Sequence, residues 1–246
     1  MDQELQQHWN KINQQRAAFY GWFAGAFAKE LSNQAFEFYS SGNSEALLQA
    51  LAQLGFETEI ARLQAFTAAL EGTEDERINL MADFASCFLL DSRQSALPYA
   101  SYYLEESKLL YGDANARMNE FLQGNELQLH EDFREPADHL VVYLAAMADW
   151  CAEVADTTDP VEIQRQIAAQ HEFLTEGLLT WLGDWAKRLD SVPNLSFTFY
   201  PAMGQLLLSY VTVDADAMLD GQDDGSAAKA VEAAARTSAD GNHTLH

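Results

Sequence analysis

A run of ionisable residues just past the middle of the chain is the first place where this sequence could support chemistry. The run Glu135-Pro136-Ala137-Asp138-His139-Leu140 holds two carboxylates and an imidazole, and further acids and a histidine precede it: Glu126, His130, Glu131 and Asp132. Carboxylate and imidazole groups bind metal ions and transfer protons. The run is therefore the first candidate for a metal centre or an acid–base pair.

The spacings within this run do not suit either chemistry. A helical di-iron site needs carboxylates from four helices and two Glu-x-x-His pairs. Here Glu126 to His130 and Glu135 to His139 are each four residues apart, and neither spacing recurs on another predicted helix. Adjacent helical residues such as Asp138 and His139 point about 100° apart, which makes a direct dyad awkward. We expect no metal site and no catalytic dyad here.

Other motifs of catalysis or cofactor binding are missing from the sequence. None of GxGxxG, GxxxxGK[ST] and GxSxG occurs. A calcium loop tried from Asp220 has Val231 at its twelfth position, where a bidentate glutamate is needed. Cys87 and Cys151 each lie in an apolar helical pattern, which indicates buried free thiols in a reducing cytosol. The sequence predicts no catalytic residue, no metal and no enzyme.

The candidate run marks the beginning of a predicted helix. Pro136 suits the first helical position, where its missing N–H is not needed. Asp138 would then fall in the first turn, where a carboxylate meets free backbone N–H groups and the positive end of the helix dipole. An apolar face follows from Leu140 to Cys151. A helix cap alone accounts for these residue types, so the capping interpretation stays open beside a functional one.

Apolar residues at helical spacing predict an all-α protein. Residues 73–91 are expected to form a helix with Ile78, Ala82, Ala85, Phe88 and Leu89 inward. A long helical pattern from Asp159 is expected to break near His171 to Phe173. The remaining expected helices cover residues 5–30, 33–40, 44–54, 58–70, 99–106 (a short helix or turn), 114–123, 136–151 and 195–213.

Three segments follow from this pattern. Residues 1–130 form an N-terminal helical lobe, residues 131–213 a C-terminal lobe, and residues 214–246 an acidic tail too poor in large apolar residues to order itself. The polar stretch from Gly124 to Arg134 joins the two lobes. If this joint extends, the second lobe could dock on a partner chain through identical contacts, so a domain-swapped homodimer is expected beside the monomer.

The formal charge of −24 and the sequence pI of about 4.3 limit the partners. Such a field repels phosphate backbones and anionic membranes, so nucleic acid is not expected. It attracts a basic partner, such as a peptide rich in arginine, although acidity also serves solubility alone. The longest apolar runs, Phe19–Ala28 and Leu140–Ala148, are too short to span a membrane, and the first residues are acidic where a signal peptide is basic. We expect a cytoplasmic protein.

Several motifs together resemble one family. They are the run from Leu97 to Leu104, Gly112, Arg117-Met118-Asn119, the run from Glu135 to Leu140, and Phe173-Leu174-x-x-x-Leu178-x-x-Trp181. The chain is similar, over roughly residues 5 to 213, to the TorD group of the TorD/DmsD/NarJ redox-enzyme chaperones. Relatives often carry His-Leu before the late tryptophan, whereas this chain has Gly177-Leu178, so no role of that imidazole carries over.

The resemblance implies a cytoplasmic, all-helical chaperone dedicated to one molybdenum-cofactor enzyme. Such chaperones bind the twin-arginine signal peptide of the client and shield the apo-enzyme while its cofactor is inserted. A trimethylamine N-oxide reductase would be the client of a TorD-type member. The resemblance also implies weak binding of GTP and domain-swapped dimers.

The expected peptide site combines the candidate run with the tyrosine-rich segment before it. Glu135 and Asp138 would bind the basic end of the peptide, and His139 would add a hydrogen bond or sense pH. The apolar part of the peptide would lie on Tyr99, Tyr103 and Leu104, with Pro136 holding the run in place. Two alternatives stay open: a helical adaptor that binds a folded partner, and a helical metal or redox enzyme.

Overall fold

The computed structural model describes residues 3–125, 127, 129 and 133–223, and in these residues it is all-α, as predicted. No strand occurs in the described part, which has only one isolated β-bridge, between Tyr99 and His139. The helical elements are α1 (Gln3–Ala28), α2 (Asn33–Ser40), α3 (Glu45–Leu51), η1 (Ala52–Phe56), α4 (Glu57–Ala69), α5 (Glu74–Phe88), α6 (Ala100–Leu104), α7 (Asp113–Gly124), α8 (Leu140–Val154), α9 (Pro160–Glu172), η2 (Phe173–Leu178), α10 (Leu179–Asp190) and α11 (Phe199–Asp223).

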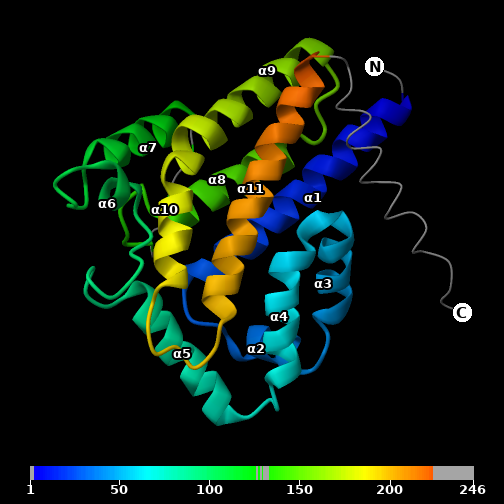
Figure 1. The fold of residues 1–246 in the computed structure, drawn as a ribbon. Coiled ribbons are helices and arrows are strands. Elements are labelled where there is room, and N and C mark those ends of the chain that lie inside the picture. The colour runs from blue at the N-terminus through cyan, green and yellow to red at the C-terminus, as the bar shows by residue number, and fades with distance from the viewer. Residues whose placement is uncertain (1–2, 126, 128, 130–132, 224–246) are drawn as a thin grey trace, which may run out of the picture.

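Helices from both ends of the chain pack together around one hydrophobic core. The most extensive contact in the described residues joins α1 to α8, and α11 packs against α10, α4 and α9. Figure 1 shows α11 lying across α1 near the middle of the molecule, with α2 to α4 on one side and α6 and α7 on the other. The largest fully buried side chains come from α1, α10 and α11: Tyr20, Phe23, Trp181, Trp185, Phe199 and Tyr200. The division into two lobes and the domain swap stay predictions.

Local signals in the sequence explain several helix boundaries. Thr73 and Glu76 form the predicted capping box at the start of α5, with hydrogen bonds of 3.3 and 2.9 Å to each other's backbone N–H. Asp159 caps α9, accepting from the backbone N–H of Val161 at 3.0 Å, with Pro160 at the first helical position. Gly55 adopts a φ of 99°, which suits the kink between α3 and α4 because glycine has no Cβ to clash.

The predicted inward face of α5 is partly wrong. Ile78 and Leu89 are 51% and 62% exposed. The buried residues of this helix are instead Leu80, Asp83, Phe84, Cys87 and Phe88. The helix carries two apolar stripes. The stripe that contains Leu80, Phe84 and Phe88 packs against the core, whereas the stripe that contains Ile78 faces solvent. The buried carboxylate of Asp83 belongs to this inner stripe because it accepts hydrogen bonds from the backbone N–H groups of Ser196 and Phe197, each at 2.8 Å.

The last helix is longer than the sequence indicated. It was expected to end at Val213, with a tail from Asp214, but α11 continues to Asp223. The rest of the predicted tail, residues 224–246, lies outside the described residues. The acidic residue at the predicted boundary has a partner at the other end of the chain, because Asp214 forms an ion pair with Arg16 at 2.8 Å.

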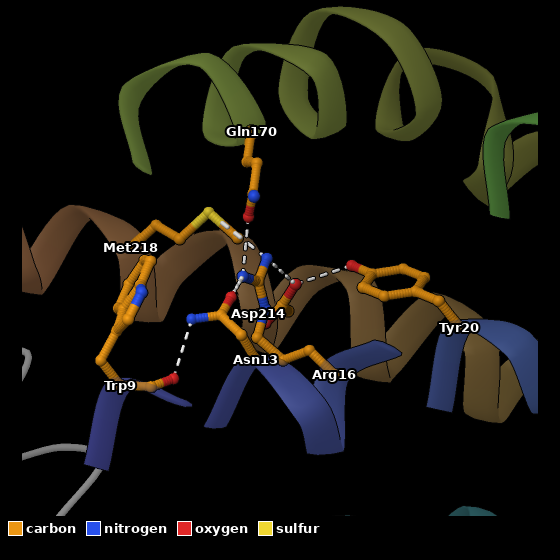
Figure 2. A network of polar contacts seen from close by, with 7 residues as sticks. All are labelled: Trp9, Asn13, Arg16, Tyr20, Gln170, Asp214 and Met218. Carbon is orange, nitrogen blue, oxygen red and sulfur yellow. Dashed lines mark hydrogen bonds and ion pairs between the residues drawn. The ribbon is translucent and has the colours of Figure 1, made fainter. Parts of the chain in front are cut away.

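A buried polar network holds this part of α11 against α1 and α9 (Figure 2). The guanidinium of Arg16 donates to both carboxylate oxygens of Asp214, at 2.8 and 3.0 Å, and the hydroxyl of Tyr20 donates to the same carboxylate at 2.7 Å. The remaining N–H groups of Arg16 donate to side chains of all three helices: Asn13, Gln170 and Met218. Every donor of the guanidinium thus has an acceptor.

The predicted break in the long helix from Asp159 takes the form of a π-helical turn, η2, between α9 and α10. The backbone stays helical through it, and Figure 1 shows α9 and α10 running in different directions on its two sides. Such turns contain one residue more than an α-helical turn and often occur at functional sites.

Candidate functional site

The candidate run lies against the start of α6. His139 and Tyr99 form the isolated antiparallel bridge, and the backbone bonds on its two sides are 3.1 Å from Ala100 N–H to the Asp138 carbonyl and 2.8 Å from Leu140 N–H to the Pro98 carbonyl. The bridge fixes the beginnings of α6 and α8 beside each other. We call the residues Tyr99, Glu135, Pro136, Asp138 and His139 the junction.

Asp138 caps a helix, but not the one that the sequence predicted. Its side chain is fully buried, and Oδ2 accepts from the backbone N–H of Ser101 at 2.8 Å and from the Ser101 hydroxyl at 2.5 Å. Ser101 lies in the first turn of α6, so Asp138 caps α6 from across the bridge. The other oxygen, Oδ1, has no hydrogen-bond partner among the described residues.

His139, not Pro136, marks the start of α8. The helix begins at Leu140, and Nδ1 of His139 accepts from the backbone N–H of Val141 at 3.1 Å, so the imidazole is the cap. The expectation of Pro136 at the first helical position is therefore wrong, because the bridge to Tyr99 holds the run in a non-helical conformation. Burial lowers the pKa of His139 from 6.5 to about 4, which keeps the imidazole neutral near pH 7.

The structure brings five of the seven predicted peptide-binding residues together at the junction and places the other two apart. Glu135 is exposed, and one of its oxygens accepts from the Tyr99 hydroxyl at 2.5 Å. Burial, together with the Glu135 carboxylate, raises the pKa of Tyr99. Tyr103 stacks on Trp181 with 5.8 Å between ring centroids, and Leu104 is 40% exposed. Pro136, Asp138 and His139 are buried, so only the rim of the junction meets solvent.

The apolar part of the peptide was expected in an aromatic-lined groove at Tyr99, Tyr103 and Leu104. The structure has a groove of about 630 Å³, and most of the residues that line it were not predicted. Helices α7, α8 and α9 and the π-turn η2 form its walls, and Leu104 is the one predicted peptide-binding residue that lines it. The other lining residues are Arg117, Met118, Phe121, Asn125, Leu127, Tyr143, Trp150, Glu153, Arg165, Gln166, Ala169, Glu172, Phe173, Glu176 and Gly177.

Four aromatic rings make the apolar part of the groove. Phe121 and Phe173 lie 4.6 Å apart between ring centroids, and Trp150 is 5.6 Å from the first and 6.0 Å from the second. Tyr143 is 5.6 Å from Phe173. We call these four residues the aromatic floor. Rings that contact one another across three helical segments offer a broad apolar surface to a ligand.

Charged side chains surround the aromatic floor, and the acids among them are free. Glu153, Glu172 and Glu176 line the groove, and within the described residues no side-chain partner of theirs occurs. Arg165, by contrast, is held by Glu162 through two hydrogen bonds of 2.8 and 2.6 Å. Arg117 also lines the groove and has no ion-pair partner among the described residues. Three unpaired carboxylates against this one free cation leave the groove with a net negative charge, which suits an apolar segment that carries positive charge.

The aromatic floor is only partly indicated by the sequence. Phe121 and Tyr143 lie on the apolar faces of the helices predicted over residues 114–123 and 136–151, and Phe173 is part of a family motif, whereas Trp150 and the three glutamates were not singled out. The available signal was Trp150, a large aromatic residue between Asp149 and Cys151 on a helix whose other face already supplies the core.

No metal centre is found in the part of the chain that the structure describes, where no three His, Cys, Asp or Glu residues cluster suitably. Of the residues first considered, Glu126, His130, Glu131 and Asp132 lie outside the described residues. In the same part of the chain no helix is both long and apolar enough to cross a bilayer.

Comparison with known proteins gives consistent matches over most of the chain. The family model for the nitrate reductase delta subunit matches residues 49–187. The chaperone protein TorD of Psychrobacter sp. (strain PRwf-1) is 39% identical over 219 residues, which cover 87% of this chain and 96% of that protein. The proteins of the same name from Actinobacillus pleuropneumoniae serotype 7 and Vibrio cholerae are 35% and 33% identical, each over 82% of this chain and over 95% and 91% of their own length.

Proposed function

Because this chain belongs to the TorD/NarJ family of redox-enzyme chaperones, we propose that it binds the twin-arginine signal peptide and the apo form of one molybdenum-cofactor reductase. The client is of the trimethylamine N-oxide reductase type. The chaperone holds it in the cytoplasm until its cofactor has been inserted, and export follows. The relatives are named as chaperones, which agrees with the prediction that this protein is not an enzyme.

The observation that carries the proposal is the groove. A signal peptide has a basic end and an apolar middle, and such a segment can dock as a helix in an apolar groove. The aromatic floor supplies the apolar contact, the free glutamates supply the complementary charge, and the net charge of −24 attracts the peptide from a distance. Leu104 connects the groove to α6 and hence to the junction, which fixes the neighbouring helix starts.

A calorimetric titration with a synthetic twin-arginine peptide tests the proposal. We expect binding with a dissociation constant in the range of about 1 to 100 μM, lost when both arginines are replaced by glutamine. Phe173→Ala, which removes part of the aromatic floor, should weaken binding about tenfold because apolar contact area is lost. Phe38→Ala is the matched control, since Phe38 is also half-buried but lies on α2, outside the groove. Equal heats for both peptides would contradict the proposal.

The alternative function, an adaptor for a folded partner, has one observation in its favour. Ile78 on α5 and the two residues that follow the helix, Leu89 and Leu90, are exposed by 51%, 62% and 52%. Exposed apolar side chains in a row can mark a protein contact surface. If the adaptor function holds, the twin-arginine peptide gives no specific heat, and Ile78→Ser together with Leu89→Ser weakens capture of the folded reductase.

Two further features of the proposal stay open to direct measurement. The domain-swapped homodimer predicts a dimer peak beside the monomer in size-exclusion chromatography with light scattering, and monomer alone at every concentration would contradict it. Weak GTP binding, which the family resemblance implies, predicts a measurable change of nucleotide fluorescence on titration.

A further inference from the structure

Two of the free glutamates stand one helical turn apart on a single wall of the groove. Glu172 ends α9 and Glu176 lies in η2, four residues later, and both are exposed. Carboxylates at this spacing repel each other along a helix surface. Within the described residues neither has a basic partner, and each lines the groove beside Phe173. This pair is a place where two positive charges of a ligand would relieve a repulsion.

Tyr143 on the opposite wall provides a second and independent sign of a ligand. Its side chain lines the groove and is only 5% exposed. Even so, its hydroxyl makes no hydrogen bond within the described residues. The hydroxyl itself is not fully enclosed, so it meets the solvent of the groove. A hydroxyl left without a partner on the wall of an open groove is available to a ligand donor, and the ring face can hold a cation.

The buried network around Arg16 shows what this protein supplies to a guanidinium. There a carboxylate accepts two N–H groups in parallel and a tyrosine hydroxyl donates to that carboxylate. Two amide oxygens and the sulfur of Met218 accept the remaining donors (Figure 2). The groove wall offers the same kinds of group: the carboxylates of Glu172 and Glu176, the hydroxyl of Tyr143 and the amide of Gln166. Two arginines line the groove, and neither pairs with these carboxylates: Arg165 is held by Glu162, and Arg117 forms no ion pair with the described residues.

The junction carboxylates are less suited to this role. Asp138 is fully buried and holds Ser101 with one oxygen, and Glu135 holds the hydroxyl of Tyr99. An arriving arginine would have to break these bonds and uncover Asp138, whereas Glu172 and Glu176 are already open to solvent.

We infer that the paired arginines of the bound peptide lie between Glu172 and Glu176 on one wall of the groove and Tyr143 on the other, and that the adjoining aromatic floor takes the apolar segment. The inference rests on the proposed function and makes it more specific. It assigns charge recognition to the α9–η2 wall in place of the junction, where the sequence had predicted it.

Peptide titration with charge-neutral variants tests whether Glu172 and Glu176 bind the arginines. The double variant Glu172→Gln with Glu176→Gln should weaken binding of the twin-arginine peptide about tenfold or more, and it should bind the arginine and glutamine peptides almost equally. The matched control, Glu37→Gln with Glu57→Gln, changes the net charge equally on exposed sites outside the groove. It should retain the discrimination between the two peptides.

Two single variants divide the roles further. Tyr143→Phe keeps the ring and removes the hydroxyl, so we expect a loss of about threefold for the arginine peptide and little change for the glutamine peptide. Asp138→Asn keeps an acceptor for Ser101, so discrimination should persist. Melting curves of all variants establish that each is folded before titration.

The outcomes separate the inference from the proposed function. If the native protein does not distinguish the two peptides, the proposed function fails, and the inference with it. If the native protein distinguishes them and the Glu172/Glu176 double variant does so equally well, the proposed function stands and the inference is overturned. Loss of discrimination in Asp138→Asn alone would likewise overturn it and return the arginines to the junction.

Discussion

The two faces of α9 meet very different surroundings. On one face Gln170, only 1% exposed, helps to bind a buried guanidinium whose every N–H group has an acceptor. On the other face, and one turn further into η2, Glu172 and Glu176 are exposed to solvent without a basic partner in the described residues. The same helix thus presents an acceptor for a fully paired guanidinium inward, although the Gln170 amide nitrogen itself lacks a partner among the described residues, and unpaired carboxylates outward.

The comparison separates the polar groups that stabilise the fold from those that are free to meet a ligand. A buried charge must be fully paired, since leaving one partner alone costs several kcal/mol. Exposed carboxylates can stay unpaired at little cost because water solvates them. Unpaired groups are available to a ligand, whereas those of the network are not. The junction belongs with the inner face, since Asp138 and His139 are buried and serve helix starts.

The largest effect should come from breaking the buried pair. Asp214→Ala leaves the Arg16 guanidinium buried without its carboxylate, so we expect the free energy of unfolding to fall by about 3 to 5 kcal/mol in urea denaturation. The double variant Arg16→Met with Asp214→Leu removes both charges and should recover much of this loss. A loss below about 1 kcal/mol in the single variant would show that the buried network contributes little to the stability of the fold.

The dependence of stability on acid pH should test whether His139 at the junction is buried like a residue of the interior. The unfolded imidazole of His139 takes up a proton near pH 6.5 and the folded one near 4, because burial lowers its pKa. The contribution of the neutral imidazole to stability is therefore complete above pH 6.5 and is lost as the pH falls toward 4, by about 3 kcal/mol. His139→Asn keeps a capping acceptor without titrating, so its unfolding free energy should fall less steeply over this range. Parallel pH profiles would contradict the burial of His139.

A smaller effect is expected where the inner face of α9 meets the network. Gln170→Ala removes one acceptor from Arg16, so the free energy of unfolding should fall by about 1 to 2 kcal/mol. Gln164→Ala, an exposed position on the same helix, is the control and should change it by less than about 0.5 kcal/mol. Equal losses would mean that helix propensity, rather than the network, sets the result.

The smallest effect on stability should come from the groove wall. Glu172→Gln with Glu176→Gln removes a like-charge repulsion at a spacing of four residues, so we expect a gain of about 0.3 kcal/mol. The same denaturation measurement at low salt checks this value, and added salt should reduce the gain. A loss above about 1 kcal/mol would mean that these carboxylates have a structural role.

The fold class and most helix boundaries were predictable because local signals determine them. The capping box at Thr73, the Asp159-Pro160 start and the left-handed Gly55 each act within a few residues. The family was also predictable, from the motifs between Leu97 and Trp181. These features depend on residues that are close in sequence, so a single chain reveals them.

The failures involve partners that are distant in sequence. Asp214 seemed to begin a tail because its partner, Arg16, lies 198 residues away. Asp138 caps α6, 37 residues earlier, and the bridge that permits this moves the start of α8 from Pro136 to Leu140. On α5, periodicity could not decide which of two apolar stripes faces the core. The groove combines residues of several helices, so no single pattern could have indicated which residues line it.

The π-turn determines the rotation of α10 about its axis, and therefore which residues of α10 face the core. Deleting one residue between Phe173 and Leu178 would allow an ordinary α-helix to close there, and α10 would rotate by about 100° and shift by about 1.5 Å. Trp181 and Trp185, both fully enclosed, would then leave their places in the core. Chains of this design should therefore tolerate substitution at η2 far better than any change in its length.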